Sequence, residues 1–196
     1  TQHWSSAASD VYKRQGMGRE DIDVRCLGSG RPFVLEIKRP LRRNLPTKDL
    51  VDMVQTHASG KVEVDELSWC TRKKVNEVKQ SRSEKTYTIR FRAEGIDDEK
   101  KAEEAILSLS GQIINQETPK RVSHRRAAKT RRRKVTSIDN VSFEGDEIEL
   151  TLRCEAGTYV KELVHSDEGR TKPSVREVLD ADCEVIWLDV LEIHDD

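Results

Sequence analysis

The segment VTSIDNVSFEGDEIELTLRC, residues 135–154, holds two stretches of strand-forming residues on either side of Glu144 and Gly145. Successive side chains of a strand point to opposite faces of a sheet, so half-buried strands alternate between apolar and polar residues. Glycine between two such stretches is typical of a hairpin turn. The segment therefore predicts a hairpin with strands at 135–143 and 146–154, and with it an antiparallel sheet.

Further strand and helix patterns surround this hairpin. Strands are expected at 23–27, 32–37, 62–69, 87–91, 112–115 and 185–193. Helices are expected at 47–58, 71–80, 97–110, 158–165 and 175–179, with Thr47 and Asp97 as the N-caps of the first and third. Strands dominate and hairpin connections recur, which favours an α+β fold with a mixed, largely antiparallel sheet flanked by helices and loops.

The fifteen residues before the hairpin, KRVSHRRAAKTRRRK (Lys120–Lys134), form the basic segment, with nine Lys or Arg and no Asp or Glu. The whole chain has a net charge of −1, so the remainder carries −10. Such asymmetry points to a local surface that binds a polyanion. Contacts to phosphates give affinity and salt dependence without a choice of sequence. A solvated arm is the alternative interpretation, because blocks of like charge often form tails.

Composition limits the class of protein. The 196 residues are 35% hydrophobic and 36% charged, which suits a domain with a large surface facing a charged partner. No run approaches the roughly eighteen apolar residues of a membrane span, and no secretory signal is visible, so we expect no membrane contact. The four cysteines (Cys26, Cys70, Cys154 and Cys183) form no CxxC pair. We therefore expect no metal site and a reduced, cytoplasmic setting.

The amino end differs from the rest of the chain. Residues 1–15, TQHWSSAASDVYKRQ, have no clear period and resemble translated adaptor sequence. We expect this leader to be non-native and residues 16–196 to form one domain.

Two short motifs carry residue types suited to catalysis. GREDID (residues 18–23) lies just before an expected strand, so its carboxylates can face a cleft while the sheet fixes their position. In GTYVK (157–161), Gly157 permits a tight strand-to-helix turn. The first helical turn then places a flat hydroxyl-bearing ring, Tyr159, near a cation, Lys161. Each motif alone is weak, because turns with a capping aspartate and helices with such a start are common.

Together the two motifs resemble the signatures of pseudouridine synthases. GRED is similar to GR(L/T)D, and GTYVKELV is similar to GTYIRxL. Three longer stretches occur in order: GREDIDVRxLGxGRPFVLEI, TPKRVSHRRA and CEAGTYVKELVHSDEGRTKPSV. They resemble one branch, the archaeal and eukaryotic tRNA pseudouridine synthases acting on uridines 54 and 55. The resemblance covers residues 16–196 and implies the catalytic domain of that family, without the amino-terminal RNA-binding region of its members.

The resemblance also implies roles for individual residues. Asp21 matches the catalytic aspartate, Tyr87 the tyrosine that stacks on the target uracil, and Tyr159 the second tyrosine of the substrate site. Lys161 stands where other branches have an arginine that pairs with the aspartate, and it keeps the charge but loses the bidentate fork. Leu188 corresponds to an apolar residue that lines the uracil pocket. From the basic segment we expect phosphate contacts by Lys120, Arg121, Arg125, Arg126, Arg131, Arg132 and Arg133.

The implied reaction is an isomerisation. The N1–C1′ bond of uridine breaks, the uracil turns over, and C5 bonds to C1′, with no redox change and no group lost. We therefore expect tRNA as the partner, no cofactor, and a monomer. An aspartate is ionised at neutral pH and can act as the nucleophile or charge stabiliser. It can attack C1′ or C6, or remove a ribose proton to give a glycal, and the sequence does not distinguish these paths.

Two alternatives remain open at this point. Asp23 followed by Glu36-Ile37-Lys38 loosely matches a D…ExK pattern, which would indicate a metal-dependent nuclease. A non-catalytic RNA-binding module would use the basic segment alone. Conversion of uridine that depends on Asp21 separates the enzyme from the module, and cleavage that requires a divalent metal marks the nuclease.

Overall fold

The computed structural model describes residues 12–18 and 20–194. Contacts between Cα atoms divide the chain into two compact units, residues 1–17 with 32–81 and residues 18–31 with 82–196. Most of the leader expected at 1–15 lies outside the described residues, and its end, Tyr12–Gln15, belongs to a strand. That the leader is non-native stays a prediction.

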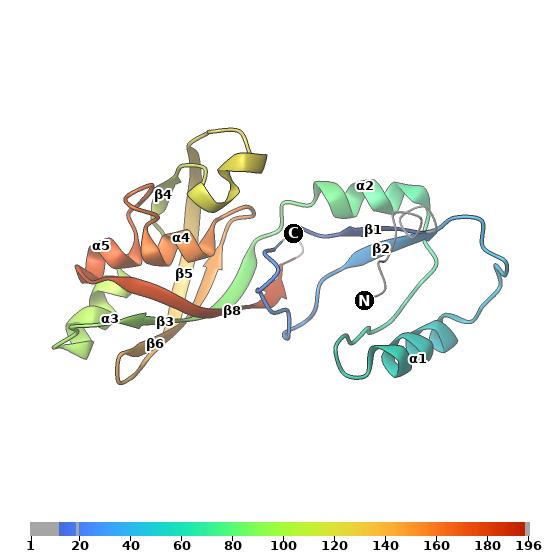
Figure 1. Ribbon diagram of the computed structural model, residues 1–196, viewed down its shortest axis with the longest axis horizontal. Coiled ribbons are helices and arrows are strands. Elements are labelled where there is room, and N and C mark those ends of the chain that lie inside the picture. Colours follow the sequence, from blue (N-terminus) through green and yellow to red (C-terminus); the bar gives the residue numbers. More distant parts are fainter. Residues whose placement is uncertain (1–11, 19, 195–196) are drawn as a thin grey trace. The chain divides into compact units, whose positions relative to one another are not determined.

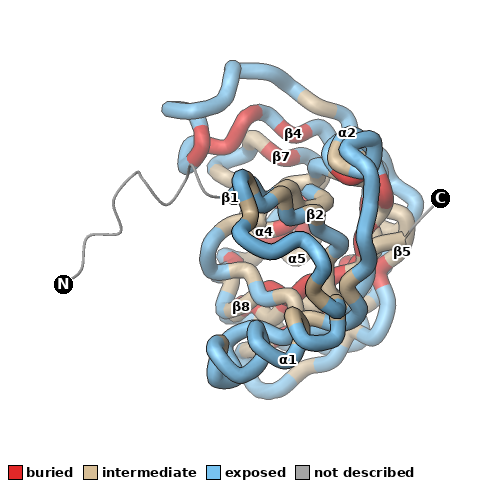
Figure 2. The backbone as a smooth tube through the Cα atoms, turned by 90° about the vertical axis from the view of Figure 1, so that its right-hand side faces the viewer, coloured by how far each residue is buried: buried red, intermediate tan, exposed pale blue. Residues whose placement is uncertain are grey.

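The described part of the first unit holds a two-stranded sheet and two helices (Figure 1). β1 (Tyr12–Gly16) pairs antiparallel with β2 (Phe33–Ile37). α2 (Arg72–Gln80) packs against both strands and buries Val78. α1 (Thr47–Ala58) has no buried residue, as its colours in Figure 2 show. The first unit thus has little core of its own.

Both helices of this unit confirm the sequence prediction, but two details differ. Pro46 occupies the N-cap of α1 in place of the expected Thr47, and no side chain caps that end. The strand expected at 62–69 is wrong, because these residues pair with no strand in the described part of the chain. Alternation can mark a strand, but only a neighbouring backbone can supply its ladder of hydrogen bonds.

The second unit is built on a six-stranded antiparallel sheet of order β7-β4-β5-β6-β3-β8. Its strands are β3 (Lys85–Ala93), β4 (Ile113–Gln116), β5 (Arg131–Glu144), β6 (Glu147–Cys154), β7 (Thr171–Lys172) and β8 (Cys183–Ile193). Its helices are α3 (Glu99–Leu107), the 3-10 helix η2 (Lys120–Arg125), α4 (Val160–His165) and α5 (Val175–Leu179). The expected α+β class with a largely antiparallel sheet is confirmed.

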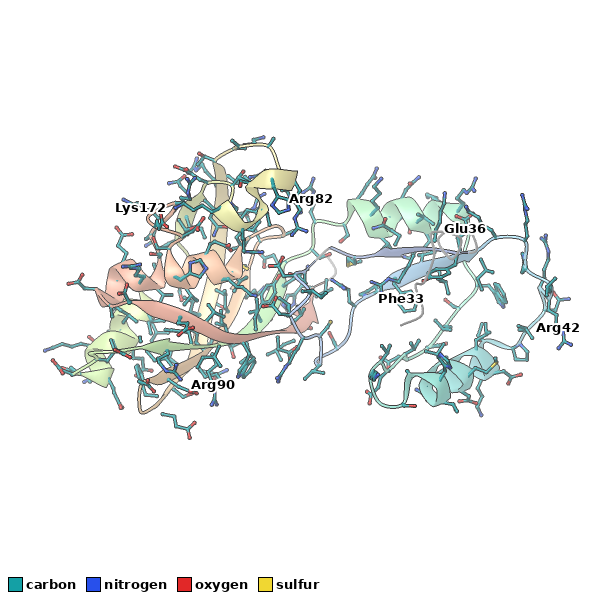
Figure 3. All side chains as sticks on the ribbon, in the orientation of Figure 1. Phe33, Glu36, Arg42, Arg82, Arg90 and Lys172 are labelled. Atoms are coloured by element: carbon teal, nitrogen blue, oxygen red, sulfur yellow. The ribbon has the colours of Figure 1, made fainter. Side chains whose placement is uncertain are left out.

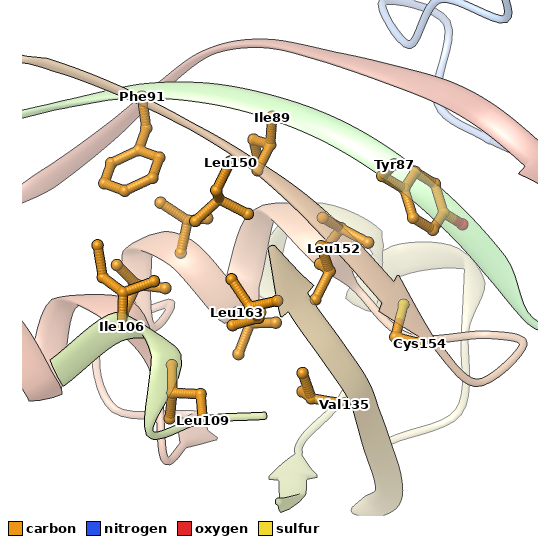
Figure 4. Close-up of a cluster of buried hydrophobic side chains, with 14 of the residues drawn as sticks. Tyr87, Ile89, Phe91, Ile106, Leu109, Val135, Leu150, Leu152, Cys154 and Leu163 are labelled. Carbon is orange, nitrogen blue, oxygen red and sulfur yellow. The ribbon is translucent and has the colours of Figure 1, made fainter. Parts of the chain in front are cut away.

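Alternation along β3 separates the two faces of this sheet. Tyr87, Ile89 and Phe91 point into the core, where they join apolar side chains of the neighbouring strands and of α3 and α4 (Figure 4). Phe91 and Ile89 are fully buried, as is Leu163 of α4. Burial of such side chains contributes about 1.5–3 kcal/mol each, so this core is the main source of stability in the second unit.

The opposite face of β3 is polar. Arg90, labelled in Figure 3, donates from Nε to Glu149 at 2.9 Å and lies 3.3 Å from Glu147, both on β6. These cross-strand pairs hold charges of opposite sign on a half-exposed surface, where each pair contributes little to stability. None of the helices in the described part of the chain is long and apolar enough to cross a lipid bilayer.

The hairpin at 135–154 is confirmed, with four corrections to the predicted elements of the second unit. Its turn lies one residue later than expected, at Gly145 and Asp146, and β5 begins four residues earlier, inside the basic segment. The helix expected from Asp97 starts after Asp98, whose side chain accepts from the Lys101 N–H. The strand expected at 23–27 is wrong, because only Arg25 forms a bridge, to Asp189 of β8.

Gly28 keeps the chain close to β8 beyond that bridge. A Cβ atom at this position would collide with the backbone of Leu191. Glycine is therefore required for the close approach of the two backbones, which continues where the Ser29 N–H donates to the Leu191 carbonyl at 2.7 Å.

Candidate active site

The loop that carries Asp21 is fixed to the start of β3. Glu20 forms an ion pair with Lys85, whose side chain is only 8% exposed. Gly18 has a φ of 73°, and a Cβ there would collide with the Lys85 amine. Asp21 itself stays partly open, with a side chain that is 25% exposed. The ion pair of Glu20 with the buried Lys85 thus fixes the loop, and the neighbouring carboxylate of Asp21 stays accessible.

A second turn carries Tyr159 at the N-cap of α4. Gly157 turns the chain with a φ of 80°, and a Cβ there would lie 3.4 Å from Nη2 of Arg133. From Tyr159 onward, α4 buries Val160, Leu163 and Val164 in the core. Their burial fixes the helix, and with it the polar side chains between them.

The buried amide of Gln116 on β4 also holds this turn. Its Nε2 donates to the carbonyl of Tyr159, and its Oε1 accepts from the N–H of the same residue, both at 2.9 Å. The sequence analysis missed Gln116. A polar residue two positions after the buried Ile114 of a strand was the available signal.

Arg121 of η2 connects the two motifs. Its Nη1 lies 2.5 Å from Oδ2 of Asp21. On its other side, Nε and Nη2 donate to the carboxylate of Glu162 at 2.6 and 3.2 Å. Glu162 lies on α4 and is 1% exposed. Burial works against the charge of Arg121, but the hydrogen bond to Glu162 and the charge of Asp21 prevail and raise the pKa of Arg121.

Lys161 has a different partner from the one expected. The resemblance implied a pair with Asp21, but the Nζ of Lys161 lies 2.5 Å from Oδ2 of Asp23. The hydrogen bond from Lys161 lowers the pKa of Asp23. The reason for the difference is that Arg121 holds Asp21, with Arg125 at 3.7 Å as a second cation. Lys161 instead meets the next carboxylate of the same loop.

A cavity of about 430 Å³ lies beside this second pair. It is lined by Asp23, Lys161, His165 and the β8 residues 183–188, including Trp187 and Leu188. The structure thus brings Lys161 and Leu188 together at one cavity. Of the other expected site residues, Asp21 and Tyr159 do not line it.

Tyr87 does not line the cavity either. It is 4% exposed and lies in the core, opposite Leu152 of β6 and Val190 of β8. Burial raises the pKa of its hydroxyl, and the charge of Glu20 acts in the same direction. The ring therefore lies in the core rather than on an open surface, where stacking on a uracil would require it.

The basic segment is partly folded into this site. Lys120 pairs with Glu168, and Arg131 donates from Nη1 to the Thr118 hydroxyl at 3.0 Å. Arg133 donates to the carbonyl of Arg132 at 2.8 Å. Arg126 and Arg132 are exposed. Of the seven residues expected to contact phosphates, most thus have partners within the protein.

No three His, Cys, Asp or Glu side chains of the described residues cluster in a way that could hold a metal ion. The nuclease alternative requires Asp23 and Glu36, which belong to different units. Each has a cationic partner in its own unit, Lys161 and Arg72 respectively.

Known proteins resemble this chain along nearly its whole length. The family model described as "Pus10, C-terminal" matches residues 2–194. A protein of Methanothrix thermoacetophila named tRNA pseudouridine synthase Pus10 is 47% identical over 178 residues, which is 91% of this chain and 39% of that protein. One of the same name from Thermofilum pendens is 44% identical over 190 residues, covering 95% of this chain and 43% of that protein. The chain thus spans less than half the length of these relatives.

A solved structure supports the fold. A chain in the crystal structure of a Cbf5-Nop10-Gar1 complex matches with a TM-score of 0.51 and 19% identity, covering 78% of this chain and 46% of that one. At this identity the likeness concerns the fold alone.

Proposed function

Because the chain belongs to the Pus10 C-terminal family, we propose that it carries the catalytic machinery of a tRNA pseudouridine synthase. The proposed reaction is the isomerisation of uridine to pseudouridine in the TΨC arm, at position 54, position 55 or both. The strongest support comes from Arg121, which joins the Asp21 loop to α4, and so unites the two motifs that suggested this chemistry.

Asp21 is the proposed reactive group. Its carboxylate is partly exposed, next to a fixed cation, and can act on C1′, on C6 or on a ribose proton. In each path the N1–C1′ bond breaks and the C5–C1′ bond forms, while C5 gives up its proton and N1 gains one. No electron acceptor or donor enters this balance, so the proposal includes no cofactor.

The detached uracil must be held while it turns over. The cavity beside Lys161 and Leu188 offers an apolar wall and a cation for this purpose. Removing a base from its stack costs a few kcal/mol, which contacts with the tRNA backbone can offset. In this proposal Tyr87 supports the site through its packing in the core rather than as a residue that lines the cavity. We also propose that the enzyme is monomeric and cytoplasmic.

The experiment uses unmodified tRNA and two proteins. One is this chain, and the other is this chain joined behind the amino-terminal part of the relative from Methanothrix thermoacetophila. Pseudouridine is mapped by mass spectrometry after carbodiimide labelling. We expect conversion in the TΨC arm by at least the joined protein, without added metal. Asp21→Asn should keep its affinity for tRNA and lose conversion.

Three results would contradict the proposal. Binding of tRNA by both proteins without conversion would favour the RNA-binding module. Cleavage of the RNA backbone that a chelator abolishes would favour the nuclease. Full conversion by Asp21→Asn would show that the reactive carboxylate lies elsewhere. Asp97→Asn is the control, because it removes a charge from an exposed aspartate of the same unit outside the site and should leave conversion unchanged.

A further inference from the structure

The guanidinium of Arg121 contacts two carboxylates with all three of its nitrogens. Nε and Nη2 face Glu162 in a bidentate arrangement, and Nη1 faces Asp21. Planar two-point pairing of this kind fixes orientation as well as distance. The position of Arg121 is therefore set by α4, and Asp21 binds to a cation that is already in place.

The buried carboxylate explains why Arg121 is held so firmly. Glu162 is 1% exposed, and among the described residues its ion-pair partner is Arg121. A charge taken out of water is stable only when it is paired and hydrogen-bonded. If Arg121 turned to a phosphate of bound RNA, Glu162 would lose this compensation. The guanidinium is thus poorly suited to the phosphate contact that its place in the basic segment first indicated.

We infer that Arg121 is the positioning residue of the catalytic carboxylate, with Glu162 as its anchor. The inference rests on the proposed function. Arg121 takes over the role that the resemblance gave to Lys161, which pairs with Asp23 instead. Glu162 fixes the guanidinium, and the guanidinium fixes Asp21 in orientation relative to the substrate. The amino end of the basic segment thereby belongs to the active site.

Lysine cannot replace arginine in this role. A single ammonium group lacks the planar fork needed to bind Glu162 at two points and Asp21 at a third. We therefore expect Arg121→Lys to keep the charge of the site but lose much of its geometry, so its rate should lie between those of wild type and Arg121→Met.

The test separates rate from binding. Single-turnover rates at saturating tRNA, dissociation constants and their salt dependence are measured for wild type, Arg121→Met and Arg132→Met. Misplacement of a reactive group by about 1 Å can cost about 100-fold, so we expect Arg121→Met to lower the rate by about that factor. Its dissociation constant should stay within about threefold of wild type, with an unchanged salt slope, because no phosphate contact is lost. Arg132→Met, on the exposed side of the segment, should weaken binding and flatten the slope by roughly one.

The opposite pattern would overturn the inference. If Arg121→Met weakens binding and flattens the salt slope as Arg132→Met does, while its rate at saturating tRNA equals that of wild type, Arg121 is a phosphate ligand. Failure of the proposed function itself is distinct, because wild type would then convert no uridine.

A folding defect must be separated from lost positioning, because Arg121→Met leaves the Glu162 charge buried. The double variant Arg121→Met with Glu162→Leu removes both charges together, which buried ion pairs usually tolerate. We expect this variant to unfold cooperatively near the wild-type temperature and still to show the rate loss of about 100-fold. A wild-type rate in the folded double variant would refute the inference.

Discussion

The side-chain amide of Gln116 binds the main chain of Tyr159 at two points, donating to its carbonyl and accepting from its N–H. Gln116 has no exposed surface, and its Nε2 also lies 3.4 Å from the Thr171 hydroxyl. The short strand β4 therefore determines where the turn before α4 lies. This contact crosses more than forty positions of sequence and places a proposed substrate-binding residue.

We expect Gln116→Leu to destabilise the chain. The substitution keeps an apolar fit but leaves the N–H of Tyr159 without its partner, while the carbonyl keeps its hydrogen bond from the Leu163 N–H at 3.0 Å. An unpaired N–H of this kind costs about 1–3 kcal/mol in the free energy of unfolding. Urea unfolding followed by circular dichroism measures the difference. Asn115→Ala, on the exposed side of the same strand, is the control and should change stability by less than about 0.5 kcal/mol. Equal stability of both variants would contradict the two-point contact.

Lys161 and Asp23 should show a measurable coupling in a double-mutant cycle. Their ion pair is half open to solvent, and pairs of this kind contribute about 0.2–1 kcal/mol. We expect Lys161→Met and Asp23→Asn to be coupled by such an amount in urea unfolding. Lys161→Met and Asp21→Asn should instead be additive within about 0.5 kcal/mol. The reverse result would restore the pairing of Lys161 with Asp21 that the resemblance implied.

Local patterns predicted most of the second unit. The alternation of Tyr87, Ile89 and Phe91 marked β3, and glycine marked the turn at Gly145. The prediction failed where the presence or absence of a neighbouring strand determines whether a segment becomes a strand. Residues 62–69 alternate as a strand does, yet no described strand lies beside them. Residues 131–134 carry four positive charges, yet they extend β5 because β4 pairs with them.

In the site too, local sequence motifs predicted some residues, whereas contacts between distant segments could not be predicted. Asp21 and Tyr159 were identified as candidates because each lies in a short motif, and the order of residues within a motif can be read from the sequence alone. The pairing of Arg121 with Asp21 and Glu162 joins three segments that are distant in sequence, and no local pattern indicates it. A glutamate among the buried residues of α4 was the one available signal, since a buried carboxylate requires a cation.

Stability should fall in acid through Glu84. A hydrogen bond from the Thr136 hydroxyl at 2.8 Å, followed by one from Arg153 at 2.7 Å, lowers the pKa of Glu84 from its ordinary value of 4.5. The folded chain thus binds fewer protons at this group than the unfolded chain. Ionised Glu84 therefore stabilises the fold fully above the unfolded value, and this contribution is lost as pH falls through the lower folded value.

Glu84→Gln tests this dependence. Urea unfolding of wild type and variant should differ most near pH 7, and the difference should shrink below a pH of about 4.5. Glu94→Gln, an exposed change on the same unit, serves as the control and should give a small difference at every pH. If the difference in the free energy of unfolding between wild type and Glu84→Gln stays unchanged in acid, the role of Glu84 is contradicted.

The exposed arginines of the basic segment should govern the salt dependence of tRNA binding. Arg126 and Arg132 face solvent, whereas Arg131 is held by Thr118 and by the carbonyl of Lys129. Each phosphate contact contributes roughly one to the slope of log affinity against log salt concentration. We therefore expect Arg126→Gln with Arg132→Gln to reduce that slope by about two, and Arg131→Gln to change it little while lowering the free energy of unfolding. Filter binding at several salt concentrations measures the slopes, and equal slopes for both variants would show that solvent exposure does not select the phosphate ligands.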